Sequence, residues 1–168
     1  MNLWQDVFTS LLVSGSATII ALIIGLPLAS VCARNEFVFK RTLLTVIRAM
    51  YGLPPVVVGV AVYLMFSKQG IFSGLELLFT IQGMIVAQSL LILPLVWGVS
   101  WTSMAAIPKE VLETYKMIGA SRPEVITHLM EARKGVSGAV MLAFGRAIAE
   151  VGAVMIVGTN DQLVGIFT

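Results

Sequence analysis

Residues 108–133 read PKEVLETYKMIGASRPEVITHLMEAR, a long polar stretch that lies between apolar runs of the chain. Two short helices are predicted within it. The first opens at Pro108, where the missing proline N–H costs nothing, and stops at Gly119, which can adopt the left-handed conformation of a helix end. The second opens at Ser121 as N-cap, with Glu124 three residues later as its capping partner. These helix start and stop residues predict a compact segment of two helices.

The composition of the whole chain indicates a membrane protein. Of its 168 residues, 58% are hydrophobic and only 12% are charged, and the mean hydropathy is +0.95. Soluble domains carry about 25% charged residues. The net charge of +2 comes without a basic cluster interleaved with aromatics, so no nucleic-acid partner is expected. A single cysteine, Cys32, excludes a disulfide framework and a cysteine metal cage.

The apolar runs predict an all-α integral membrane protein with about four transmembrane helices, each needing about 20 residues to cross the lipid bilayer. Residues 1–168 are expected to form a single transmembrane domain. Its predicted spans are residues 8–33, 49–67, 77–107 and 136–158. The second span is interrupted early by Gly52, Pro54 and Pro55, since proline lacks the N–H of a helix interior.

The fourth predicted span differs from the others in its residue types. Gly138, Gly145 and Gly152 recur every seven residues, a pattern typical of a helix face that packs closely against another backbone. The span also holds Arg146 and Glu150, four residues apart and so on one helix face. Two interpretations stay open: an ion pair that locks helices together, or a wet path in which Arg146 attracts an anion.

The distribution of positive charge predicts the orientation of the chain in the plasma (inner) membrane. With the N-terminus outside, the inner segments are residues 34–48 and 108–135, which hold nine of the eleven Lys and Arg residues. Positively charged loops stay on the cytoplasmic side. Residues 108–135 are therefore expected to form a cytoplasmic loop of a multi-pass protein.

The sequence contains no recognisable catalytic, nucleotide-binding or metal-binding motif. It has no Walker-type phosphate loop, no dinucleotide glycine fingerprint and no zinc-ligand cluster around the lone His128. We therefore expect no catalytic residues, no metal site and no cofactor, and any nucleotide hydrolysis must come from another subunit.

Three motifs resemble those of one transporter family. Glu113-Thr114-Tyr115 followed by Gly119, Ala120 and Ser121 resembles the EAA loop of binding-protein-dependent ABC importer permeases, with both alanines replaced. Residues 144–153, FGRAIAEVGA, and residues 53–59, LPPVVVG, resemble span motifs of the oxyanion permeases in that family. The motifs occur in the family's order and cover most of residues 50–160.

The resemblance implies the core of a type I importer permease (MetI-like) that works as a homodimer. A cytoplasmic ATP-binding subunit would drive it and an extracytoplasmic solute-binding protein would supply it. Glu113, Gly119, Ala120 and Ser121 are carried over as the residues that couple the permease to the ATPase. Permeases of this type continue with a further span after the region matching residues 158–160, so the resemblance also predicts a C-terminally truncated chain.

The favoured cargo is tungstate, because Glu131-Ala132-Arg133 and residues 149–154 resemble tungstate-type permeases most. A molybdate or sulfate permease of the same family is the alternative. A self-contained secondary transporter would need intramembrane acids and an internal repeat, whereas the sequence has one intramembrane acid and no evident repeat. A membrane scaffold without transport is the third hypothesis, and co-purification with an ATPase subunit separates the first from the other two.

Overall fold

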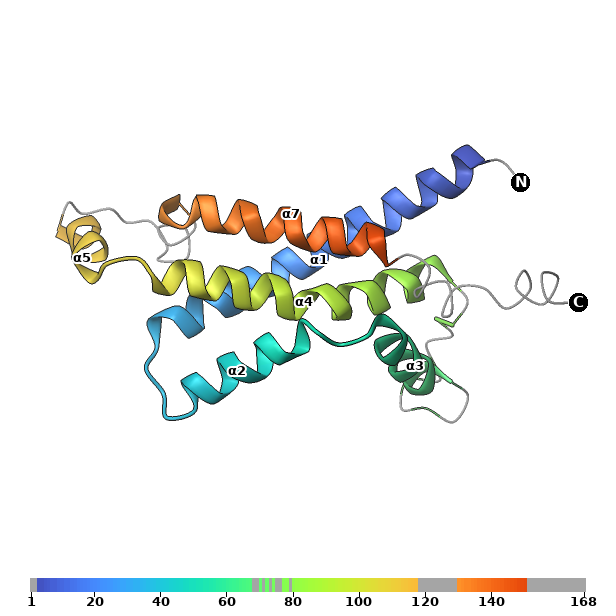
Figure 1. Cartoon of the computed structure of the whole chain (residues 1–168), viewed down its shortest axis with the longest axis horizontal. Coiled ribbons are helices and arrows are strands. Elements are labelled where there is room, and N and C mark those ends of the chain that lie inside the picture. Colours follow the sequence, from blue (N-terminus) through green and yellow to red (C-terminus); the bar gives the residue numbers. More distant parts are fainter. Residues whose placement is uncertain are drawn as a thin grey trace, which may run out of the picture. The chain divides into compact units, whose positions relative to one another are not determined.

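A computed structural model describes residues 3–67, 70, 72, 74, 77–78, 80–117 and 130–150 (Figure 1). Within these ranges all regular secondary structure is helical, which confirms the predicted all-α class. The helices are α1 (Leu3–Arg34), α2 (Lys40–Met50), α3 (Pro55–Phe66), α4 (Ile81–Ala105), α5 (Lys109–Met117) and α7 (Arg133–Ala149).

Helix α1 has the residue distribution of a membrane span. Its buried positions hold small side chains such as Ala17, Ala21 and Ala29, while large apolar side chains such as Ile19 and Ile23 lie on the outside. A water-soluble helix would bury the large apolar residues instead. Small residues inside and large ones outside suit a helix whose neighbours approach closely and whose outer face meets lipid.

Two described helical stretches are long and apolar enough to cross a membrane alone, Val7–Arg34 of α1 and Ile81–Ala105, which is α4. They overlap the first and third predicted spans, residues 8–33 and 77–107. The second differs from its predicted range, because α2 ends at Met50 and α3 begins only at Pro55; together they count as a third span only if the pair is one broken crossing. The fourth is described as far as Ala149, the end of α7, and residues 151–158 of that prediction lie outside the described residues.

The chain separates into two compact units. The first unit comprises Met1–Ile20, Gly52–Ile92 and Phe144–Thr168, and the second comprises Ala21–Tyr51 and Leu93–Ala143. In the first unit, Val62 of α3 and Ala87 of α4 form a small buried apolar cluster. In the second unit the core is larger and joins α1, α2, α4 and the approach to α7.

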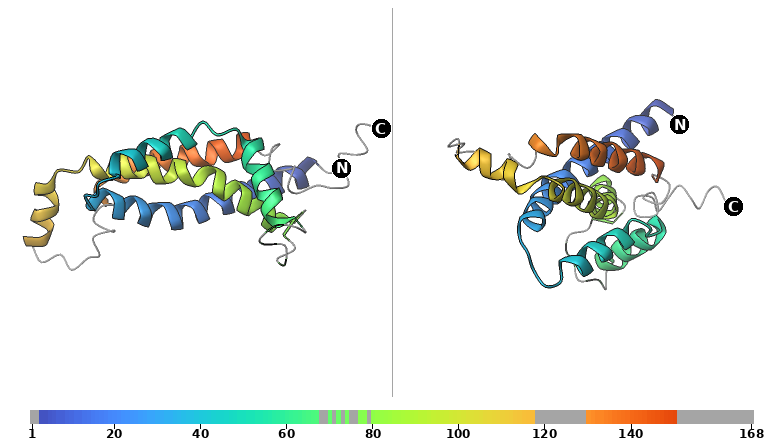
Figure 2. Two further views of the ribbon diagram at one scale, coloured as in Figure 1. Left: turned by 90° about the horizontal axis from the view of Figure 1, so that it is seen from below. Right: turned by 60° about the vertical axis from the view of Figure 1, so that its left-hand side comes forward.

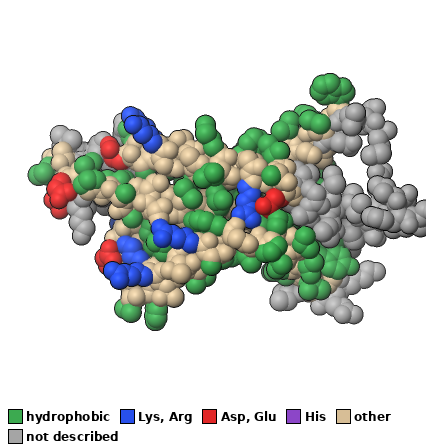
Figure 3. All heavy atoms as spheres, in the orientation of Figure 1, with side chains coloured by type: hydrophobic (Ala, Val, Ile, Leu, Met, Phe, Trp, Pro, Cys, Tyr) green, Lys and Arg blue, Asp and Glu red, His purple; other side chains and the backbone are tan. Residues whose placement is uncertain are grey.

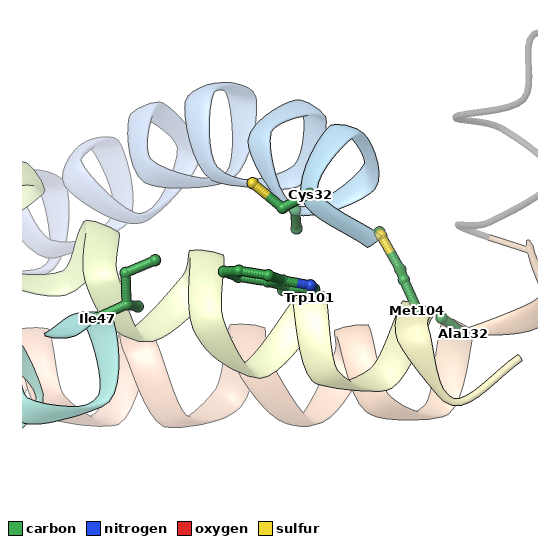
Figure 4. Packing of buried hydrophobic residues seen from close by; sticks show 6 residues of the cluster. Cys32, Ile47, Trp101, Met104 and Ala132 are labelled. Carbon is green, nitrogen blue, oxygen red and sulfur yellow. The ribbon is translucent and has the colours of Figure 1, made fainter. Parts of the chain in front are cut away.

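The core of the second unit is built around Trp101 of α4. Figure 4 shows Trp101 and Met104 facing Cys32 of α1, with Ile47 of α2 and Ala132 at the two ends of the cluster. Trp101 is only 1% exposed, so it serves packing rather than an interfacial aromatic belt. Its ring also stacks on Phe37, with centroids 6.5 Å apart.

Helix α2 was not predicted, because residues 34–48 read as a basic cytoplasmic segment. Its inward-facing residues are Leu43, Leu44 and Ile47, a helical spacing that the sequence does contain. The residue that follows the helix, Tyr51, packs over Gly98 of α4, and a Cβ added there would collide with the Tyr51 hydroxyl. Glycine at position 98 therefore lets α2 lie close to α4.

The glycine face of α7 makes no close contact with the described part of this chain. A Cβ added at Gly138 or Gly145 would meet no atom of the described chain within 4 Å. The buried small residues are instead Ala139, Ala143 and Ala147, which follow one another at four-residue spacing and have no exposed surface. Alanine therefore provides the close contact inside the chain, and the two glycines lie on an outward face.

Candidate functional site

Arg146 and Glu150 form an ion pair at the end of α7. The Arg146 Nε and Glu150 Oε1 atoms lie 3.0 Å apart, and the two side chains are 19% and 21% exposed. The pair lies within one helical turn, so it does not itself join two helices. The second oxygen of Glu150 is buried and accepts no hydrogen bond from the residues described.

Arg146 makes a second contact, to the break between α2 and α3. Its Nη2 atom donates a hydrogen bond to the carbonyl oxygen of Leu53 at 3.1 Å. In an uninterrupted helix that carbonyl would accept from the N–H of Val57, four residues later, but here Val57 donates to the Pro54 carbonyl at 3.0 Å. The proline-induced break thus frees an acceptor, and Arg146 occupies it. This bond, rather than the ion pair, ties α7 to another part of the first unit.

Gln88 is a buried polar residue that sequence reasoning missed. It lies in α4, is 0% exposed, and its Nε2 atom donates to the Ala147 carbonyl and, at 3.3 Å, to the hydroxyl of Ser14. The Ala147 carbonyl lies in the last turn of α7. One amide therefore joins α1, α4 and α7. The signal that could have found it is an amide side chain in a charge-free apolar run, where residues 77–107 hold two, Gln82 and Gln88.

Ser89, the residue next to Gln88, also contributes to this buried polar region. Its hydroxyl donates to the carbonyl of Ile85 at 2.7 Å and lies 3.4 Å from the carbonyl of Ala17. Thr18 in turn donates to the Ser14 carbonyl at 2.7 Å. These bonds satisfy polar groups that would otherwise be costly within an apolar interior. The region is an internal hydrogen-bonded network of the first unit.

The cytoplasmic segment predicted from the sequence begins with α5. This helix runs from Lys109 to Met117, so it begins one residue after the predicted start at Pro108. Glu113 and Thr114 are exposed, and Met117 is 80% exposed. Figure 2 shows α5 standing apart from the other helices of the second unit. The other coupling residues carried over by resemblance, at positions 119–121, lie outside the described residues.

Within the described ranges, no three His, Cys, Asp or Glu side chains come together as metal ligands. The polar contacts described in the first unit include the hydrogen bonds of Gln88, Ser89 and Arg146 and the Arg146–Glu150 ion pair. Helix α5 presents an exposed polar surface.

Comparison with known proteins relates the chain to membrane transport. The family model described as "binding-protein-dependent transport system inner membrane component" matches residues 9–166. The chain is 36% identical over 152 residues to a probable anion ABC transporter permease protein of Haloferax volcanii, covering 90% of this chain and 66% of that protein. It is 36% identical over 160 residues to the tungstate uptake system permease protein TupB of Peptoclostridium acidaminophilum, covering 95% and 70%.

A second tungstate uptake permease protein, from Campylobacter jejuni, is 35% identical over 126 residues, covering 74% of this chain and 53% of that protein. The chain thus spans between about half and about two thirds of the length of these relatives. More distant relatives are named as permeases for molybdate/tungstate and for sulfate.

Proposed function

The chain belongs to the family of binding-protein-dependent transport system inner membrane components, and on this premise we propose that it is the permease subunit of an ABC importer for an oxyanion, with tungstate the favoured cargo. The observation that carries the proposal is the similarity, over nearly the whole chain, to a tungstate uptake permease protein. Molybdate and sulfate are the alternative cargoes, since more distant relatives are named for them.

The energy for import comes from a separate cytoplasmic ATP-binding subunit, which docks on α5 and the residues after it. The exposed Glu113, Thr114 and Met117 support this role, because a helix that only filled the core would bury one face. Glu113, Gly119, Ala120 and Ser121 transmit movement of the ATPase to the membrane helices. Helical order in α5 suits that task, because a rigid element transmits displacement where a flexible loop would absorb it.

The permease works as a homodimer in the plasma membrane, with its N-terminus outside and a solute-binding protein delivering the oxyanion to that face. The outward face of α7 supports dimer formation: Gly138 and Gly145 are open, and Met141, Leu142 and Ile148 around them are exposed. Small residues flanked by large apolar ones allow two helices to pack closely in lipid.

The cargo is tested by the ATPase activity of the reconstituted complex of permease, ATP-binding subunit and solute-binding protein. Tungstate should stimulate hydrolysis more strongly than molybdate or sulfate at equal concentration. If only molybdate or only sulfate stimulated hydrolysis, that anion would be assigned as the cargo instead. An equal increase in ATPase activity with all three anions would remove the tungstate assignment.

The coupling role is tested by comparing two variants of adjacent exposed residues on α5. Glu113→Ala should lower tungstate-stimulated ATPase activity about tenfold or more while the permease still inserts and folds, because a charge-assisted contact with the ATPase is lost. Thr114→Ala is the matched control and should retain activity, because alanine is the family's residue at that place. Equal activity in both variants and the parent would refute the role of Glu113.

A further inference from the structure

The connection between α1 (Leu3–Arg34) and α2 (Lys40–Met50) combines exposed apolar and basic side chains. Phe37, Val38 and Phe39 are consecutive and exposed, and Val38 is 94% exposed. Lys40 and Arg41 follow directly. Large apolar side chains beside Lys and Arg are typical of protein surfaces at the boundary between lipid tails and headgroups.

This connection forms one wall of a cavity of about 400 Å³ in the second unit. Its apolar lining includes Phe37 and Val38 from the connection, Leu44 from α2 and the buried Trp101 from α4. Its charged lining consists of Arg41, Lys40 and the Glu36 carboxylate. Figure 3 shows Lys and Arg side chains beside hydrophobic ones over this part of the surface.

Lys40 and Arg41, the two positively charged residues of the cavity, differ in whether their charged groups already have partners. The Lys40 ammonium is held in place by the Asn35 carbonyl at 3.1 Å and the Glu36 carboxylate at 3.0 Å. The Glu36 side chain is 81% exposed, so water screens much of its charge. The guanidinium of Arg41 is exposed and has no hydrogen bond or ion pair with any residue of the described ranges. Arg41 is therefore available to bind an anion, with Lys40 fixed beside it.

We propose that this cavity binds an anionic phospholipid of the cytoplasmic leaflet, with the phosphate against Arg41 and the start of an acyl chain along Phe37, Val38 and Leu44. A small hydrated oxyanion would satisfy the guanidinium but would leave the apolar walls uncovered. A lipid satisfies both, because its charge and its hydrocarbon are adjacent. The inference rests on the membrane placement of the chain and not on which cargo it transports.

The test is a lipid titration of the purified protein in detergent, read by native mass spectrometry. Phosphatidylglycerol and phosphatidylcholine with identical acyl chains are compared. Phosphatidylglycerol should bind at least about fivefold more tightly, which corresponds to the roughly 1 kcal/mol contributed by one basic residue near a membrane surface. Equal affinity for the two lipids would overturn the proposal, since the positive charge would then have no role.

Three variants locate the binding site. Arg41→Gln should remove most of the preference for phosphatidylglycerol, and Arg41→Lys should keep it because the charge remains. Arg48→Gln is the matched control, since Arg48 is exposed on the same helix but does not line the cavity. Unchanged helicity by circular dichroism would show that each variant is folded. An equal loss in the Arg41 and Arg48 glutamine variants would refute a defined site.

Two further titrations distinguish the lipid from other occupants. Neither inorganic phosphate nor tungstate at millimolar concentration should displace the bound phosphatidylglycerol, and displacement by either would identify a small-anion site instead. The purified ATP-binding subunit should leave the lipid bound as well. Displacement by that subunit would mean that a protein surface covers the cavity.

Discussion

Replacing Arg146 with methionine tests whether this residue holds α7 to the break between α2 and α3. Methionine keeps a long apolar side chain but removes the guanidinium, which contacts both the Leu53 carbonyl at 3.1 Å and the Glu150 carboxylate at 3.0 Å. The substitution therefore leaves one carbonyl without its donor and one largely buried carboxylate without its cation. We expect Arg146→Met to be the most destabilising single change in the first unit.

The magnitude follows from those two contacts. A hydrogen bond from a charged donor contributes about 1.5–3 kcal/mol, and breaking a fully buried ion pair costs about 3–5 kcal/mol. Both side chains of this pair are about one-fifth exposed, which lowers the second figure. We expect a loss of about 3 kcal/mol in the free energy of unfolding for Arg146→Met. Glu150→Gln should cost about half as much, because Arg146 keeps its bond to Leu53.

The double variant Arg146→Met/Glu150→Gln gives the decisive comparison. Once the carboxylate has been neutralised, loss of the arginine no longer leaves a buried charge unpaired, so the double variant should be no less stable than Arg146→Met alone. The coupling energy should be about 1–2 kcal/mol. The assay is equilibrium unfolding in mixed detergent micelles, followed by far-ultraviolet circular dichroism. Strictly additive losses, or an Arg146→Met loss below about 0.5 kcal/mol, would refute the reasoning.

Transport by the same variants distinguishes the two interpretations of Arg146. If Arg146 acts by holding the helices, Glu150→Gln should lower uptake together with stability, and the double variant should transport at least as well as Arg146→Met. If Arg146 instead attracts a passing anion, Glu150→Gln should leave uptake intact or raise it while both variants without arginine fail equally. Uptake of the cargo by proteoliposomes containing the complete importer provides this readout.

Three other changes test the packing. Gly98→Ala should destabilise the protein by about 1–3 kcal/mol through collision with Tyr51, whereas Gly15→Ala, where an added Cβ meets no described atom, should be neutral or stabilising in thermal unfolding. Gln88→Met should cost about 0.5–2 kcal/mol in the same assay, since hydrogen bonds between membrane helices are individually modest. Met141→Cys should yield a disulfide-linked dimer on a non-reducing gel if the outward face of α7 is the dimer interface. A cysteine introduced on the exposed face of α1 is the control and should yield no such dimer. The reverse result would assign the interface to α1.

The length of apolar runs and the positions of prolines predicted the helices whose bounds those two features determine. Runs of apolar residues predicted α1 and α4 because the hydrocarbon thickness of a membrane sets a length that can be counted along the chain. Pro108 marked the start of α5, and the two prolines after Leu53 marked the break before α3. Helix α2 was missed because its Lys and Arg side chains were interpreted as those of a cytoplasmic loop, although its apolar residues have helical spacing.

The sequence by itself determined the helical class, the membrane setting, the family resemblance and the proximity of Arg146 to Glu150, which one helical turn guarantees. Only the tertiary structure decided which helix faces are buried, since in a membrane span both faces are apolar and hydrophobicity does not distinguish them. That is why α7 buries its alanines and not its glycines. The bond from Arg146 to the Leu53 carbonyl, 93 residues away, likewise follows from tertiary packing and from no spacing within the sequence.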